Sequence, residues 1–123
     1  MKLVDTSAWI SFINPKYRSL QNAELRELIQ KYEVATCDFV LLELQGYRRS
    51  EEKAVRLIIE TVPKLDHSEE VWEHACQIAR KCRKAGYPIP NSDILIYATA
   101  KHHNCQVFHS DKHFIQLAEI DGR

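Results

Sequence analysis

The sequence predicts an α/β fold: a three-layer α/β/α sandwich around a central, mainly parallel sheet of four or five short strands. Short apolar runs, rich in small and β-branched residues, alternate along the chain with longer segments of helical periodicity, which is the pattern of a parallel sheet covered on both faces. The chain has 123 residues, of which 45% are hydrophobic, so one domain (1–123) with one hydrophobic core is expected.

The first half of the chain contains two predicted strands and four predicted helices. The strands are KLVD (2–5) and EVATC (33–37), and the helices cover 6–13, 19–32, 38–50 and 51–61. Thr6 or Ser7 is expected to cap the first of these helices, since hydroxyl side chains are favoured at that position. Asp38 is expected to cap the third.

The second half contains two further predicted strands and three helices. The strands are VPKLD (62–66) and CQVFHS (105–110), and the helices cover 68–85, 92–103 and 111–120. The longest of them is expected to start at Ser68 and to end near Ala85, because Gly86 suits the residue that follows a helix.

Charge and hydropathy argue against two classes of protein. The formal net charge is zero, which disfavours binding of nucleic acid over a large basic face but leaves room for a small nuclease with an acidic metal site. No apolar run approaches the ~20 residues needed to span a membrane, and the N-terminus lacks the pattern of a secretory signal. A soluble cytoplasmic protein with no membrane partner is therefore expected.

Four acidic residues stand at informative positions in this scheme. Asp5 ends the first strand, Asp111 follows the last strand, and Asp93 lies in the first turn of a helix. In a parallel α/β fold these three positions belong to one edge of the sheet, where such folds bind ligands. Glu43 lies inside the helix after the second strand, where it interrupts the apolar stretch VLLEL and would be buried.

A group of buried carboxylates needs a positive partner. Glu is rarely buried without one, and two unit charges about 4 Å apart repel by roughly 4 kcal/mol at an effective dielectric constant of 20. Hard oxygen ligands favour Mg²⁺, with Mn²⁺ as a substitute. Such a site positions a phosphate and activates water.

Each acid also has a purely structural explanation. Asp5 and Asp111 are suited to cap the helices that follow them, and Asp93 complements the dipole of its helix from the first turn. Glu43 fits a solvated helix face. These explanations account for the acids one by one, whereas a metal site accounts for all four together.

Four segments occur in the order and spacing of a known family. They are LVDTSAWI (3–10), LLEL (41–44), IPNSDILIYATAKHHN (89–104) and HSDKHF (109–114). With them the sequence resembles the PIN-domain ribonucleases, and among these the small VapC-like toxins of toxin–antitoxin pairs. The resemblance spans residues 1 to about 117 and implies a PIN-like fold. It also implies that the acidic metal site is formed by Asp5, Glu43, Asp93 and Asp111.

The resemblance assigns supporting roles to neighbouring residues. Thr6 or Ser7 is expected to contact metal-bound water or the last acid of the site. This family usually has Thr or Ser at the position of His109, and Ser110 is expected to replace that hydroxyl. His113 stands where many members carry a further acid.

The resemblance further implies a reaction and partners. Mg²⁺, or Mn²⁺ in its place, is expected to activate a water that attacks an RNA phosphodiester bond. The implied protein partners are a cognate antitoxin, whose C-terminal segment binds across the helices, and a second copy of the chain in a homodimer.

Basic and histidine-rich segments allow further interpretations. Arg48, Arg49 and Lys53 beside the Glu43 helix are candidates for contact with RNA phosphates, or else form a solvated helix face. A zinc site is conceivable in the C-terminal part, but the spacing fits no compact finger and surface histidines are the simpler explanation. The residues concerned are His102, His103, Cys105, His109 and His113.

Two alternative functions remain open at this level. The first is a Mg²⁺-binding, receiver-like phosphoacceptor domain. It is disfavoured because receivers carry adjacent acids near the first strand, where this chain has the single Asp5. The second is a catalytically inactive PIN-like scaffold that binds RNA or a partner, and it is disfavoured because all four acids are present.

Overall fold

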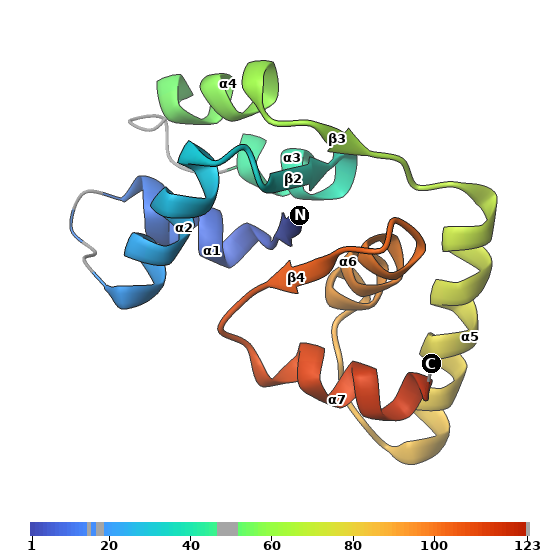
Figure 1. Cartoon of the computed structure of the whole chain (residues 1–123). Helices are drawn as coiled ribbons and strands as arrows, with labels where there is room; N and C mark the ends of the chain where they lie inside the picture. The colour runs from blue at the N-terminus through green and yellow to red at the C-terminus, as the bar shows by residue number, and fades with distance from the viewer. Residues whose placement is uncertain (15, 17–18, 47–51, 123) are drawn as a thin grey trace.

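The computed structural model describes residues 1–14, 16, 19–46 and 52–122, and it contains a parallel sheet surrounded by helices (Figure 1). The strands are β1 (Lys2–Val4), β2 (Val34–Cys37), β3 (Lys64–Leu65) and β4 (Gln106–Phe108). The helices are α1 (Thr6–Ile13), α2 (Leu20–Gln30), α3 (Asp38–Gln45), α4 (Glu52–Thr61), α5 (Glu69–Ala85), α6 (Asn91–His102) and α7 (Lys112–Asp121).

The four strands form one sheet in the order β3-β2-β1-β4, and all neighbouring pairs are parallel. Lys2 lies opposite Val34 on one side and opposite Gln106 on the other. Cys37 lies opposite Leu65. The predicted parallel sheet is confirmed, with four strands. Because all strands point the same way, their carboxyl ends share one edge of the sheet.

Both faces of the sheet are covered, which confirms the predicted three layers. All four residues of β2 are buried, and Leu3 and Val4 of β1 have no exposed surface. α6 packs against β1 and β4, while α3 packs against β2. In Figure 1 the strands cross the middle of the molecule, with α1 and α2 on one side and α5 on the other.

α6 is enclosed by its neighbours. Its residues 94–100 are all buried, and α5 packs along it. Burial around the whole circumference explains why this segment is apolar without a polar stripe. A buried helix is a firm support for Asp93 in its first turn. Among the helices of the described residues, none has both the length and the hydropathy that crossing a membrane requires.

Most helix ends agree with the sequence. Ser19 and Ser68 cap α2 and α5 through their hydroxyls, and Gly86 ends α5 with a positive φ of 77°. α2 stops at Gln30, two residues earlier than predicted, because Tyr32 has a φ of 57°, which is not helical. The predicted helix 38–50 is observed to Gln45, and its residues 47–50 lie outside the described part of the chain.

The structure decides between the two caps that the sequence offered for α1. Asp5, rather than Thr6 or Ser7, occupies the cap position, and its Oδ1 accepts a hydrogen bond from the Ala8 N–H at 2.8 Å. The physical reason is that β1 passes almost directly into α1, so the residue between them becomes the cap.

α3 is capped by a residue from a distant part of the chain. Asp38 is the first residue of this helix and not its cap, and the Cys37 side chain at the cap position makes no capping hydrogen bond. Instead the Phe39 N–H donates to His67 Nε2 at 3.2 Å. His67 Nδ1 lies 2.8 Å from Thr99 Oγ1, whose hydroxyl already donates to a carbonyl one turn earlier in α6. Nδ1 must therefore carry the proton, and neutral His67 ties α3 to α6.

Candidate metal centre

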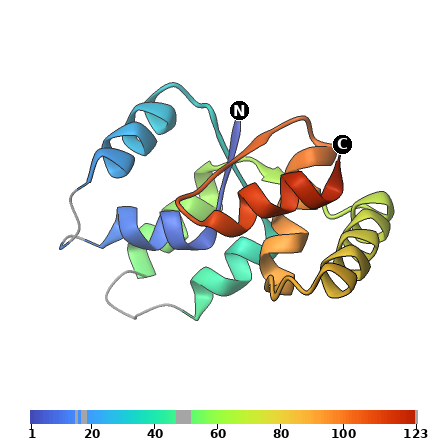
Figure 2. The ribbon, with the colours of Figure 1, turned by 90° about the horizontal axis from the view of Figure 1, so that it is seen from below.

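The four acids singled out in the sequence line one cleft at the carboxyl edge of the sheet. The cleft has a volume of about 300 Å³. Its polar lining consists of Asp5, Thr6, Ser7, Glu43, Ser92, Asp93, Asp111 and His113. In Figure 2, α1 (blue) and α7 (red) run in different directions, and residues at their starts line the same cleft.

Asp5 is the most deeply buried of the four acids, with 4% of its surface exposed. Its Oδ1 accepts from the Ala8 N–H, and the Ser7 hydroxyl donates to Oδ2 at 3.1 Å. Burial raises the pKa of Asp5 to about 6, and the nearby charges of Asp93 and Asp111 act in the same direction. The two hydrogen bonds oppose this shift but do not cancel it. The side chain is therefore both a helix cap and a destabilised anion.

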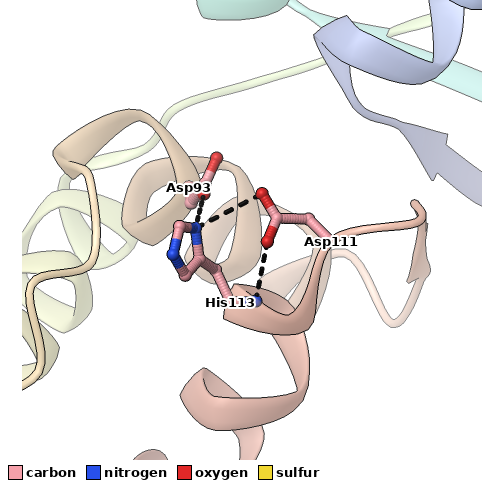
Figure 3. A group of neighbouring side chains, drawn as sticks. All are labelled: Asp93, Asp111 and His113. Atoms are coloured by element: carbon pink, nitrogen blue, oxygen red, sulfur yellow. Dashed lines mark hydrogen bonds and ion pairs between the residues drawn. The ribbon is translucent and has the colours of Figure 1, made fainter.

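Asp93 and Asp111 share one imidazole (Figure 3). His113 Nδ1 lies 3.0 Å from Asp93 Oδ2 and 3.3 Å from Asp111 Oδ2. Asp111 caps α7, and its Oδ1 accepts from the backbone N–H of His113 at 2.9 Å. Burial raises the pKa of Asp93, the bond from His113 opposes this, and the charge of Asp111 adds to it.

Glu43 lies at the mouth of the cleft and is exposed, so the expectation that it would be buried in an apolar face is wrong. The buried face of α3 carries Val40 and Leu44, which are four residues apart, whereas Leu42 is 66% exposed. The Thr6 hydroxyl donates to Glu43 Oε1 at 2.5 Å. This bond joins the start of α1 to the last turn of α3 across the cleft.

The predicted supporting hydroxyls of Thr6 and Ser7 bond acids of the cleft other than Asp111. Thr6 bonds Glu43 and Ser7 bonds Asp5, and within the described residues neither bonds Asp111. Ser110 is exposed and does not line the cleft. The connection after β4 turns the Ser110 side chain outward. The Asp111 N–H donates to His109 Nδ1 at 3.2 Å.

The donor set fits a divalent cation. Among the described residues, no Lys or Arg lies within 4.0 Å of the four carboxylates, and Lys112 beside Asp111 is exposed. Asp93, Asp111 and His113 each offer a ligand atom, and these atoms all lie within 4.8 Å of one another. Carboxylate oxygens converging without a fixed cation are the arrangement that a divalent ion stabilises.

The other histidines of the C-terminal part do not gather into a zinc site. His102 Nε2 lies 3.1 Å from His74, and His103 Nε2 bonds the carbonyl of Asp66 at 2.9 Å. The explanation of the group as surface histidines is wrong for His103, His109 and His113, which are partly buried. Sequence reasoning missed the contacts of His113, although an Asp-x-His pattern at a helix start places both side chains on the first turn.

Of the three candidate RNA-contact residues, only Lys53 is among the described residues. Arg48 and Arg49 lie outside the described residues. Lys53 is exposed near the start of α4.

Comparison with solved structures finds the same fold in several chains. FitAcB from Neisseria gonorrhoeae is similar with a TM-score of 0.72 and 22% sequence identity, over 97% of this chain and 94% of that chain. VapBC2 from Rickettsia felis, bound to a DNA fragment from its promoter, is similar with a TM-score of 0.77 and 17% identity, over 94% and 92%. FitAB bound to an IR36 DNA fragment is similar with a TM-score of 0.71 and 22% sequence identity, over 97% of this chain and 91% of that chain.

Comparison of the sequence itself points the same way. No curated protein matches it significantly. The family model of the PIN domain matches residues 2–120, which is nearly the whole chain. Together with the parallel sheet described above, this match confirms the resemblance seen in the sequence: the chain belongs to the PIN domain family.

Proposed function

We propose that this chain is a metal-dependent endoribonuclease that hydrolyses RNA phosphodiester bonds, and that it is the toxin of a VapC-like toxin–antitoxin pair. Residues 1–123 are taken to act as one PIN-like domain. One observation carries the proposal: four carboxylates from separate segments line one cleft in which no described Lys or Arg neutralises them. Membership of the PIN domain family supports nuclease chemistry at this cleft.

Asp5, Asp93 and Asp111 are the proposed ligands of a divalent cation of the Mg²⁺ and Mn²⁺ class, with Glu43 holding a second ion or orienting water. A bound ion supplies neutralisation of the phosphate charge and lowers the pKa of water toward neutrality. Asp5 is held in one orientation by the Ala8 N–H and the Ser7 hydroxyl. That fixed orientation supports a role as a direct ligand of the ion.

Glu43 is proposed to orient the attacking water. The Thr6 hydroxyl binds Oε1, so Oε2 remains available to accept a hydrogen bond at the mouth of the cleft. Lys53, with Arg48 and Arg49, is proposed to bind phosphates of the RNA on either side of the cut. Because these side chains neutralise phosphate charges and release counterions, RNA binding should be salt-dependent.

RNA cleavage tests this function directly. Purified protein is incubated with end-labelled RNA in Mg²⁺, Mn²⁺ or EDTA. We expect cleavage only with a divalent ion, and a loss of about 100-fold or more in Asp93→Asn, because removal of a transition-state charge stabiliser has effects of that order. Glu24→Gln, which removes an exposed acid on α2, is the matched control and should cleave normally. Cleavage in EDTA, or undiminished cleavage by Asp93→Asn, contradicts the proposal.

The receiver-like domain and the inactive scaffold are distinguished from the proposed nuclease by different observations. A receiver-like domain has a five-stranded sheet in the order 2-1-3-4-5, whereas this sheet runs β3-β2-β1-β4, and the family match replaces that interpretation. An inactive scaffold predicts RNA binding without cleavage in every metal, which the same assay detects.

An antitoxin is the proposed protein partner. The resemblance to VapC-like toxins and the similarity to VapBC2 and FitAB support it. An apolar cavity of about 430 Å³ between α1, α2 and α4 offers a docking site, lined among others by Trp9, Phe12, Ile29 and Leu57. Leu57 is 60% exposed, so Leu57→Asp should abolish co-purification with the product of a short neighbouring gene without unfolding the chain.

A homodimer is also proposed. Trp72 on α5 is 51% exposed beside an apolar cavity of about 300 Å³ that includes Phe39 and Ala79. Covering such a patch favours self-association. Light scattering should give the mass of two chains, and Trp72→Glu should give the mass of one.

A further inference from the structure

We propose that His113 is a nitrogen ligand of the metal centre and that it shifts the preference of the site from Mg²⁺ toward Mn²⁺. The inference rests on the proposed metal-dependent function and concerns one further side chain of the same cleft. Four carboxylates alone predict an all-oxygen site, which suits Mg²⁺. An imidazole among the ligands changes that preference.

His113 is held in place through both its backbone N–H and its imidazole ring. Its backbone N–H donates to Asp111 Oδ1 at 2.9 Å in the first turn of α7. Its Nδ1 lies 3.0 Å from Asp93 Oδ2 and 3.3 Å from Asp111 Oδ2. Adjacent ligands around a six-coordinate ion with bonds of about 2.1 Å lie about 3 Å apart. His113 Nδ1 is thus already at the spacing of a neighbouring ligand from each carboxylate, and the ligand atoms of the three residues all lie within 4.8 Å of one another.

The ring can present its lone pair to an ion by a change of tautomer. Without an ion, Nδ1 carries a proton and donates to the carboxylates. Ligation requires the proton on Nε2, and Figure 3 shows Nε2 turned away from both carboxylates. The His113 side chain is 25% exposed, so this end of the ring is not sealed in the core.

His109 is close in sequence but is not equivalent. Its Nδ1 accepts the Asp111 N–H at 3.2 Å, and its ring packs on Phe114 with the ring centroids 4.7 Å apart. It lines a different cavity from the acids. Among the described residues, His113 is therefore the imidazole placed to become a ligand, and His109 is its natural control.

Pulsed electron paramagnetic resonance of bound Mn²⁺ tests the assignment. The full chain is stripped with EDTA and loaded with less than one equivalent of MnCl₂. We expect ¹⁴N modulation of the Mn²⁺ echo in the wild type and in His109→Gln, and none in His113→Asn, whose amide can still donate to the carboxylates. The ratio of the Mg²⁺ to the Mn²⁺ dissociation constant should fall about tenfold in His113→Asp, which restores oxygen ligands only.

Mn²⁺ bound to the wild type without ¹⁴N modulation overturns the assignment, whether or not the variants fold. If that protein still cleaves RNA with divalent ions, the proposed nuclease function stands and only the role of His113 fails. If the wild type binds no divalent ion, both proposals fail. Modulation that survives in His113→Asn, or that disappears in His109→Gln, assigns the nitrogen to another residue and overturns the proposal.

Discussion

Replacing Asp5 by Asn should stabilise the metal-free protein while it removes divalent-ion binding. Asp5 is 4% exposed, and burial is the main reason that its pKa lies at about 6 rather than at its ordinary value of 3.8. At about 1.4 kcal/mol for each pH unit between these values, ionised Asp5 costs the folded state about 3 kcal/mol. Asn is as good a helix cap as Asp, so the bond from the Ala8 N–H is kept.

The pH dependence follows from the direction of this shift. Because the folded pKa is raised, ionisation of Asp5 favours the unfolded chain. Below about pH 4 the carboxyl is protonated in both states and the two proteins should be equally stable. The advantage of Asp5→Asn should grow between about pH 4 and about pH 6, and stay near 3 kcal/mol above that.

Urea unfolding in EDTA, followed by circular dichroism between pH 4 and pH 8, measures this difference. Glu43→Gln alters an exposed acid of the same cleft and should change the free energy of unfolding by less than about 0.5 kcal/mol. Saturating Mn²⁺ should stabilise the wild type and leave Asp5→Asn unchanged. The reasoning is refuted if Asp5→Asn is no more stable than the wild type at pH 7.5, or if its advantage does not vary with pH.

The remaining predictions concern the distant cap of α3 and the buried pair of His74 and Asp121. His67→Ala should lower the free energy of unfolding by about 1–3 kcal/mol at pH 7.5, since the Phe39 N–H loses its acceptor. Burial lowers the pKa of His67 below 6.5, so protonation of His67 favours the unfolded chain. The loss of stability in His67→Ala should therefore shrink below about pH 6.5. A loss that stays constant from about pH 5 to 8 argues against this role. Asp121→Ala should lower the free energy of unfolding by about 1–3 kcal/mol in the same urea assay, because buried His74 loses the hydrogen-bond partner 2.7 Å from its Nε2. Glu119→Ala on the same helix is exposed, and a comparable loss there would show that the pair is not responsible.

The fold could be predicted because each element carries its own local pattern. The residues of β2 are apolar or small and are buried on both faces, and the Ser68 and Gly86 signals mark the two ends of α5. The open points concern places where two elements meet. The sequence left the cap of α1 open between Asp5 and Thr6 or Ser7, and Asp5 became the cap because β1 leads almost directly into that helix.

The candidate site could be predicted as a set of acids but not as a set of contacts. Residues at the carboxyl ends of parallel strands must share an edge, which brings Asp5 and Asp111 into one cleft. The exposure of Glu43 depends on how α3 rests on its neighbours, and its bond to Thr6 joins residues 37 positions apart. Pairings of this kind arise from packing and leave no trace in local periodicity.

Because β1 pairs with β4, the sheet and its cleft can be completed only late in synthesis of the chain. Lys2 and Gln106 lie side by side in the sheet although they are 104 positions apart in the chain. While a ribosome is still adding β4, the emerging polypeptide holds Asp5, Glu43 and Asp93 but lacks Asp111 and the strand that closes the cleft. The proposed metal centre is therefore incomplete until translation has passed β4 and Asp111.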